Sequence, residues 1–351
     1  MYENITFEKI LKRMMDRIPS NIDKREGSVI YDALAPAAAE LHLMYIEADV
    51  ILNETFADTA HREYLIKRAL ERGLKPYPAS KAVLRGEFNC EIPIGSRFSL
   101  KTLNYVVIEK LSDFIYKLEC ESAGREGNRV FGTLIPIEYI DGLTKAELTE
   151  LLIPGEDEED TEDFRQRYLN SLNAQAYGGN IAEYKEKTKS ISGVGGVKVY
   201  PVWKGGGTVR VSITDSEYNE PTQTLIDKVQ TILDPIPNNG LGLGIAPIGH
   251  VVTVTKAETE SINITFHITY KDGYLWEDIR SYVENEVDSY LLDLRKKWED
   301  NDNICIKVIL LEAAIIQIEG VEDVQNTEIN GVNGNYILDK DKIPIRGKVS
   351  G

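Results

Sequence analysis

Histidine and cysteine are the side chains that most often bind metals or act as nucleophiles, and this chain of 351 residues has four of the first and three of the second. No His has a second His or a Cys at the spacing of a metal-ligand pair. The cysteines are far apart, odd in number and without a CxxC pair. We therefore expect no metal site, no cofactor and no disulfide framework. The residues concerned are His42, His61, His250, His267, Cys90, Cys120 and Cys305.

Two clusters of glycine could in principle cradle a phosphate. The first, at 205–207, stands between VKVYPVW and TVRVSI, two strand-like runs, and this context predicts a hairpin connection. The second consists of Gly240, Gly242 and Gly244, which neither Lys-Ser/Thr nor a helix start follows. Neither cluster predicts a nucleotide site.

Carboxylates are the remaining candidates for chemistry. Residues 156–163, EDEEDTED, hold seven acids, but the alternating D-x-D-x-D-G pattern of a calcium loop is missing. Acids stabilise a helix N-terminus, so a helix start beside a linker is the better interpretation. Some pair of acids could still flank a glycosidic bond, which leaves a tail-associated cell-wall hydrolase as the alternative function. No spacing singles out such a pair and there is no G-x-S-x-G elbow, so we predict that the protein is not an enzyme.

The charge balance narrows the class of partner. The chain has 40 Lys and Arg against 57 Asp and Glu, a net charge of −17. That excess argues against binding nucleic acid or an anionic membrane. No signal-peptide run and no stretch of about 18 apolar residues occurs. We expect a soluble protein made in a cytoplasm.

The first part of the chain is predicted to be helical. The spacing predicts a long helix over about 28–55, interrupted or started at Pro36. Its apolar residues recur by alternating threes and fours, a seam that packs lengthwise on other helices. Those helices could belong to this chain or to another; we expect another chain. The candidate interface residues are Tyr31, Leu34, Ala38, Leu41, Tyr45, Ala48 and Leu52.

The rest of the chain predicts an α+β, multidomain protein. Alternation with period two indicates a small β domain over 79–142, followed by an acidic linker and helix over 143–180. An I-x-G-V-x-x-V pattern at Ile191–Val197 recurs at Ile318–Val324. Around each copy the order of elements fits an α/β sandwich with a mainly antiparallel sheet. The expected parts are a helical bundle-forming region at 1–78, the β domain, the linker with its helix, and two sandwiches at 181–258 and 259–351.

Several segments together resemble the phage baseplate J family. They are REGSVIYDALAPAAAEL, then GEFNCEIPIGSRFS and ECESAGREGNRVFGTL, then ELLIPGEDEEDTEDFRQRYLNSL with the following Tyr177-Gly178-Gly179-Asn180. The similarity covers nearly the whole chain and weakens after about residue 260. It is greatest to the version found in contractile prophage-like elements and phage-tail-like bacteriocins of Gram-positive bacteria.

The resemblance implies a structural role in the baseplate wedge of a contractile phage tail or phage-tail-like particle. The family's members are joined into a ring around the central hub and spike. The expected partners are other copies of the chain and further wedge proteins, with hub, spike, sheath or tube proteins contacted indirectly. Helices of two copies would bundle with a further wedge protein, and carboxy-terminal domains would join neighbouring wedges. A monomeric ligand-binding protein is a third possibility, which the helical seam disfavours.

Overall fold

The computed structural model describes residues 2, 4–173 and 178–351, with the side chain of residue 173 left aside; Tyr177 of the quoted motif lies outside this set. The chain divides into two units. The first comprises Met1–Tyr77 and Glu159–Ala174, and the second Pro78–Glu158 and Gln175–Gly351. Each unit is described by itself.

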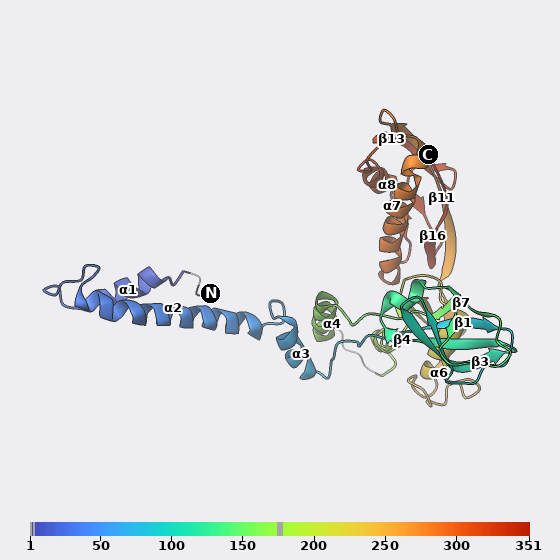
Figure 1. Cartoon of the computed structure of the whole chain (residues 1–351), viewed down its shortest axis with the longest axis horizontal. Coiled ribbons are helices and arrows are strands. Elements are labelled where there is room, and N and C mark those ends of the chain that lie inside the picture. The colour runs from blue at the N-terminus through green and yellow to red at the C-terminus, as the bar shows by residue number, and fades with distance from the viewer. Residues whose placement is uncertain (1, 3, 174–177) are drawn as a thin grey trace. The chain divides into compact units, whose positions relative to one another are not determined.

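The first unit is helical. Its elements are α1 (Phe7–Met15), α2 (Val29–Thr55), α3 (Arg62–Leu70) and α4 (Thr161–Asn173). The Ser28 side chain accepts a hydrogen bond from the N–H of Tyr31, 3.3 Å away, and so caps α2 at the expected start. Pro36 lies inside the helix. Helix α1 runs back along α2, as the blue elements of Figure 1 show, and α3 and α4 share a small core around Leu65 and Phe164.

The second unit begins with a seven-stranded sheet in the order β5-β7-β1-β4-β3-β2-β6, in which every pairing is antiparallel. Alternate residues of its strands point to a core that includes Leu84, Tyr105 and Leu118. Its strands are β1 (Lys81–Phe88), β2 (Arg97–Leu100), β3 (Leu103–Ser112), β4 (Ile115–Ala123), β5 (Gly132–Thr133), β6 (Ile135–Pro136) and β7 (Ala146–Ile153).

Strand β7 corrects the expected boundary at residue 142. It falls in the stretch 143–180, whose sequence predicts a linker and a helix, yet it pairs with β1 along its length. Ala146, Leu148 and Leu152 are buried in it, so the alternation that marks the other strands continues past the boundary. The helix expected in the same stretch is α4.

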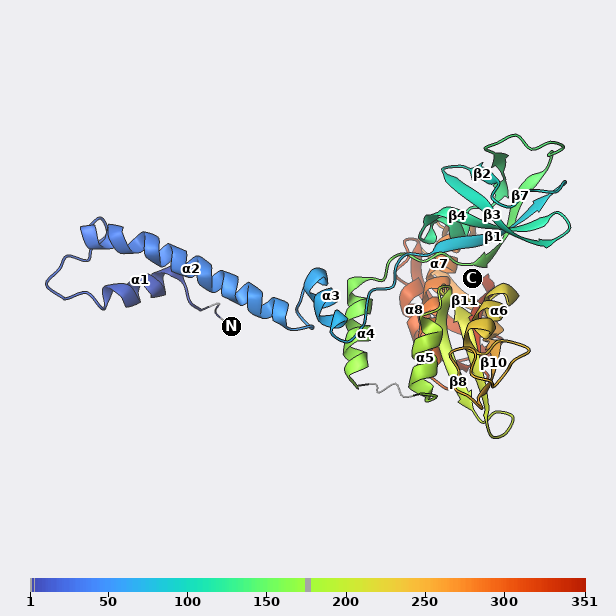
Figure 2. The ribbon, with the colours of Figure 1, turned by 90° about the horizontal axis from the view of Figure 1, so that it is seen from below.

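The first α/β sandwich has a sheet in the order β10-β9-β8. Strands β8 and β9 are antiparallel, whereas β9 and β10 are parallel. The two helices of this sandwich lie beside its strands (Figure 2). Their buried residues Tyr184, Leu225 and Val229 pack with Val197 and Val211 of the sheet. The elements are α5 (Ile181–Lys189), β8 (Val194–Pro201), β9 (Thr208–Asp215), α6 (Gln223–Leu233) and β10 (Val251–Lys256).

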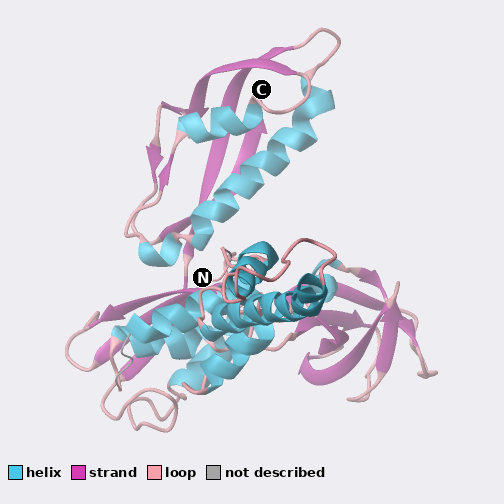
Figure 3. Cartoon of the chain, turned by 90° about the vertical axis from the view of Figure 1, so that its left-hand side faces the viewer, coloured by secondary structure: helices cyan, strands magenta, loops and turns pink. Residues whose placement is uncertain are grey.

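The second α/β sandwich repeats the arrangement with a sheet in the order β14-β13-β11-β16. Strands β11 and β13 are antiparallel, and β11 and β16 are parallel. Helices α7 and α8 lie over one face of this sheet (Figure 3). The elements are β11 (Glu258–Tyr270), α7 (Trp276–Lys296), β12 (Cys305–Ile306), α8 (Val308–Ile315), β13 (Val321–Ile329), β14 (Val332–Asn333), β15 (Tyr336–Ile337) and β16 (Lys342–Ser350).

The predicted repeat has a structural basis. Gly193 and Gly320 occupy the same place in the two I-x-G-V-x-x-V segments, and their φ angles are +96° and +97°. An L side chain rarely adopts that conformation, so glycine allows each helix to turn back into the first strand after it. A Cβ at either position would also touch a neighbouring side chain, Ile153 at Gly193 and Tyr274 at Gly320.

Candidate assembly surfaces

The buried side of α2 packs on α1 of the same chain. Ala38 is fully buried, and its small side chain lets α1 approach closely with Ile10 and Leu11. The residues packed around these three are Ile5, Phe7, Met14, Met15, Tyr31, Leu34, Ala35 and Tyr45.

This arrangement divides the seven predicted interface residues. Tyr31, Leu34, Ala38 and Tyr45 belong to the α1–α2 core, whereas Leu41, Ala48 and Leu52 lie outside it. Leu41 is 37% exposed, and Ala48 and Leu52 are half-buried. A seam spaced by threes and fours specifies that a helix lies alongside, but not which chain supplies that helix.

The opposite sides of α2 expose a second set of large apolar side chains. Seven of them are between 48% and 84% exposed, although burying one such side chain contributes about 1.5–3 kcal/mol. Leu43 and Val50 are seven residues apart, as are Met44 and Ile51, and this heptad spacing is the sequence signal for the second set. We call this set the outer face of α2: Val29, Leu43, Met44, Ile46, Val50, Ile51 and Phe56.

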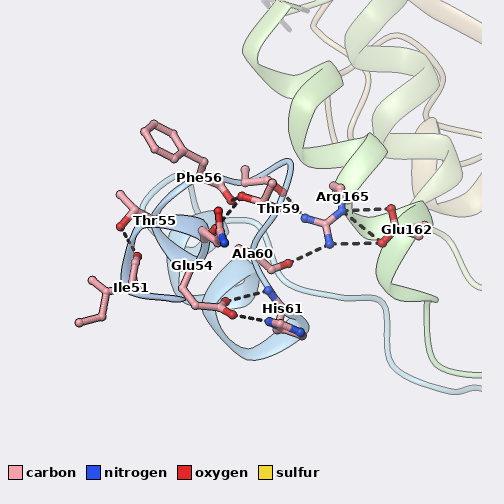
Figure 4. A network of polar contacts seen from close by, with 11 residues as sticks. Ile51, Glu54, Thr55, Phe56, Thr59, Ala60, His61, Glu162 and Arg165 are labelled. Carbon is pink, nitrogen blue, oxygen red and sulfur yellow. Dashed lines mark hydrogen bonds and ion pairs between the residues drawn. The ribbon is translucent and has the colours of Figure 1, made fainter. Parts of the chain in front are cut away.

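A polar joint fixes the end of α2 relative to α3 and α4 (Figure 4). The Glu54 carboxylate accepts a hydrogen bond from the N–H of His61 at 2.8 Å and also contacts Nδ1 of the same residue. The bond to the His61 side chain is the main reason that the pKa of Glu54 lies below its usual value. These contacts hold the N-terminus of α3 against the last turn of α2.

Arg165 of α4 completes this joint. Its guanidinium donates to the carbonyl oxygens of Ala57 and Ala60, the second at 2.8 Å, and pairs with Glu162 at 3.0 Å. The side chain is only 13% exposed. Arg165 therefore satisfies carbonyl groups of the turn that α2 leaves open at its end.

The acidic run at 156–163 behaves as a helix start, as predicted. Asp160 accepts from the N–H of Glu162 at 2.8 Å, which holds the pKa of Asp160 below its usual value. Glu159 forms a two-bond pair with Arg167, at 2.7 and 2.6 Å. Glu156 differs: it is largely buried, burial raises its pKa, and its carboxylate accepts from the N–H of Gly193 at 3.0 Å. Over the described residues, no group of three or more His, Cys, Asp and Glu could hold a metal ion.

The two sandwiches of the second unit share a polar contact region. Lys198 has an 8% exposed side chain, and its Nζ donates to the carbonyl oxygen of Asn301 at 2.8 Å and lies 3.3 Å from Asp341. The same Nζ stands 4.9 Å from the centre of the Trp298 ring. A charge removed from water requires such partners, and these come from the second sandwich.

Two histidines and one cysteine have contacts or burial that bear on their chemistry. Nδ1 of His42 lies 3.0 Å from the carbonyl oxygen of Ile5, and Nδ1 of His250 lies 2.9 Å from Oη of Tyr184. Cys120 is buried, which raises the pKa of its thiol and disfavours the nucleophilic thiolate.

The first glycine cluster lies in the hairpin that the sequence predicts. Residues 205–207 belong to the hairpin between β8 and β9. Gly240, Gly242 and Gly244 lie in the loop between α6 and β10, with no helix after them. Across the described part of the chain, no helix is both long and apolar enough to span a membrane.

Two proteins of Bacillus subtilis (strain 168) match this chain over its whole length. The phage-like element PBSX protein XkdT is 38% identical over 353 residues, covering 99% of this chain and 98% of its own. The protein YqbT is 40% identical over 354 residues, covering 100% and 98%. Two family descriptions match as well: "Baseplate J-like central domain" at residues 176–256 and "Baseplate J-like protein C-terminal domain" at 262–351. The chain belongs to the baseplate J-like family.

More distant baseplate J-like and baseplate proteins extend the comparison. Baseplate protein gp47 of Escherichia phage Mu is 23% identical over 299 residues, which cover 79% of this chain and 80% of gp47. A chain in the cryo-EM structure of the anti-feeding prophage baseplate aligns over 99% of this chain and all of its own, with 9% identity and a TM-score of 0.43. The two family matches together span both α/β sandwiches, so the expected repeat corresponds to the central and C-terminal baseplate J-like domains.

Proposed function

We propose that this baseplate J-like chain is a structural subunit of the baseplate wedge of a contractile phage tail or phage-tail-like particle. It links wedge subunits into a ring around the hub. The names of gp47 and XkdT support the setting, since one is a baseplate protein and the other belongs to a phage-like element. The described residues contribute contact surfaces, and no pocket chemistry is required for the role.

The outer face of α2 is the observation that carries this proposal. Helix α2 has 27 residues, about 40 Å at 1.5 Å per residue, and α1 has only nine with which to cover it. The apolar residues that α1 leaves exposed are the anchors that a helix–helix interface buries. Other copies of the chain and further wedge proteins are the partners that would supply the covering helices, with Leu41, Ala48 and Leu52 at the margin.

The other parts of the chain are proposed to have separate roles in assembly. We place helical bundling at 1–78, with α4 attached to it, and the β domain at 79–153 once β7 is included. The sandwiches at 181–258 and 259–351 would join neighbouring wedges. A chain shortened to end near residue 180 should then enter single wedges and fail to close a ring; closed rings in electron micrographs of that variant would contradict this part.

The test of the main proposal places charge on the outer face of α2. Met44→Asp combined with Ile51→Asp should leave the circular dichroism spectrum of the purified chain unchanged, because both side chains are already exposed. Cells that make this variant should yield few or no complete tails, because a buried unpaired carboxylate disfavours the helix interface.

Ile135→Asp is the matched control, because Ile135 is also 64% exposed but lies on β6 of the β domain, to which the proposal assigns no interface. Tails should form normally with it. Normal tails from the Met44 and Ile51 double variant, or equal loss from the control, would refute the α2 interface. Absence of the unmodified chain from purified tails would refute the baseplate role itself.

A further inference from the structure

The loop between α6 and β10 exposes an unusual concentration of large apolar side chains. Residues 235–249 contain no ionisable side chain, although 28% of the whole chain is charged. Four of them, Ile236, Leu241, Leu243 and Ile248, are 60–83% exposed. The hairpin at 202–207 lies beside this loop, because the N–H of Val251 donates to the carbonyl oxygen of Gly207 at 2.8 Å. With Val202, which is 61% exposed, these residues form what we call the apolar tip.

The apolar tip is held in one conformation. Asp234, 1% exposed, accepts hydrogen bonds from the N–H groups of Gly240 and Val252, both at 2.9 Å. The backbone of the loop also bonds to α6, since the N–H of Ala246 donates to the carbonyl oxygen of Leu233 at 2.9 Å. A loop fixed in this way cannot fold its apolar side chains inward. Exposed apolar groups on a fixed scaffold mark an interaction site.

A single exposed cation stands next to these side chains in the described hairpin. The Nζ of Lys204 lies 4.3 Å from the centre of the Trp203 ring, and its side chain is exposed. The surface of the tip is thus apolar with a positive charge at its margin, in a chain whose net charge is −17. Its complement is an apolar groove with an acidic margin.

The second sandwich has such a groove between α7 and the end of α8. It has a volume of about 670 Å³ and is lined by the aromatic rings of Tyr274 and Tyr282 and by Ile318. The carboxylates of Asp278, Glu286 and Glu319 stand along it, and among the described residues that line it none is basic. Tyr274 is placed by Gly320, where any Cβ would come within 2.4 Å of the ring. We call this site the α7–α8 groove.

We propose that the apolar tip of one copy of this chain binds in the α7–α8 groove of a neighbouring copy, with Lys204 against the groove carboxylates. This rests on the proposed function, since it requires copies held together in one baseplate. Two different surfaces meet in such a contact, so it is directional and repeats from copy to copy, and it closes a ring when the rotation between copies divides a full turn evenly. The assembly holds the copies together, so their high local concentration favours this contact.

Cross-linking between two variants in assembled tails tests the contact. Cells producing tails are made to express Ile248→Cys and Tyr282→Cys chains together, and purified tails are treated with a short bismaleimide. We expect a product of two chains in the mixture and none with either variant alone, because the two cysteines lie on different copies. Leu243→Cys with Asn285→Cys serves as a second pair if the first fails to fold. The unmodified chain measures the background from its three native cysteines.

Ile135→Cys in place of Ile248→Cys is the matched control and should give no product, because Ile135 is 64% exposed but lies on β6 of the β domain, outside the tip. Lys204→Glu should lower the cross-linked fraction several-fold, and Glu286→Lys in the same chain should restore it.

Four results would overturn the inference. They are a product from Ile248→Cys alone, which means tip-to-tip contact; a product with a different protein; a product equal to that of the control; and no product from variants that enter the tails. In all four the chain is still a tail component, so the proposed function stands. If the unmodified chain is absent from purified tails, both proposals fail.

Discussion

The Asp234 carboxylate accepts a hydrogen bond from the backbone N–H of Val252 at 2.9 Å, and so joins the residue that ends α6 to the second residue of β10. Between the two lies the whole exposed loop of the apolar tip. The same carboxylate accepts from the N–H of Gly240 and from Nδ2 of Asn239, the latter at 3.3 Å. One buried side chain therefore sets the path of a loop of uncharged residues.

Replacing Asp234 by alanine should lower the free energy of unfolding by about 2–4 kcal/mol, because the buried N–H of Val252 and the half-buried N–H of Gly240 lose their acceptor. Urea denaturation measures this loss. Asp227→Ala on the same helix is the control, since Asp227 is exposed and its carboxylate accepts a hydrogen bond from the exposed Gln223 amide; this change should alter stability by no more than about 0.5 kcal/mol. Similar losses in the two variants would show that Asp234 does not hold the loop.

Gly244→Ala should destabilise the same loop. A Cβ at this position would stand 2.4 Å from the carbonyl oxygen of Leu233 and 2.7 Å from that of Ile232, and backbone atoms cannot move aside cheaply. We expect a lower melting temperature by several degrees, equivalent to about 1–3 kcal/mol. Gly206→Ala places its Cβ in open space and should melt as the unmodified chain does. Calorimetry measures the melting temperatures. An unchanged melting temperature for Gly244→Ala would mean that the loop is not held closely against α6.

Asp215 gives the stability of the second unit a dependence on pH. Burial raises the pKa of its carboxyl to about 6, against about 3.9 in an unfolded chain. Its Oδ1 accepts from the N–H groups of Glu217 and Asn219; the charge of Glu217 also raises the pKa, and that of Arg295 lowers it. Between pH 4 and 6 the folded state holds a proton that the unfolded state has released, so this group loses stability as pH rises through 6.

Asp215→Asn keeps the Oδ1 acceptor and removes the ionisation. Relative to the unmodified chain, the variant should gain about 1–3 kcal/mol between pH 4 and pH 7, with most of the gain below pH 6. Urea denaturation at several pH values measures the difference between the two proteins, in which the titration of other carboxylates cancels. A constant difference across this range would show that Asp215 titrates normally.

Arg165→Ala should loosen the joint at the end of α2. The carbonyl oxygens of Ala57 and Ala60 would lose their guanidinium donor, at a cost of about 1–3 kcal/mol. Hydrogen exchange should quicken at residues 57–65 while the sheet of β1–β7 keeps its protection. Lys67→Ala, which removes an exposed pair with Glu63, should leave exchange unchanged. Unchanged exchange in Arg165→Ala would locate the restraint elsewhere.

For the helical part, the sequence predicts the bounds of α2 but not the partner of its apolar seam. The bounds of α2 are visible because Ser28 is a capping residue and the apolar spacing persists to Leu52. The sequence does not identify the partner of the seam, because the same spacing suits a helix of this chain and a helix of another chain. Ala38 faces α1 here only because the chain reverses between residues 16 and 28. The outer face of α2 could be suspected from its heptad-spaced pairs, but its exposure is a property of the folded chain.

The two loops of the first sandwich show a different limit. The hairpin at 205–207 follows from glycine between two strand-like runs. The run LGLGI of the apolar tip alternates as a buried strand would, so its sequence suggests core. In the structure, Asp234, the tight approach of Gly244 to α6 and the backbone bond from Ala246 to Leu233 hold it outside. Strand β7 was missed for the reverse reason, because the acids beside it suggested a linker.

A single residue separates the two sandwiches along the chain. Ala257 stands between β10 and β11, is fully buried, and its N–H donates to the carbonyl oxygen of Ile213 at 2.8 Å. A backbone that is already extended and hydrogen-bonded into a sheet can lengthen very little. A pull on the 13-residue strand β11 is therefore transmitted directly to the neighbouring sheet. If force acts on the chain during contraction of a tail, this connection would transmit it without bending. A change in domain orientation would then occur at other connections of the chain.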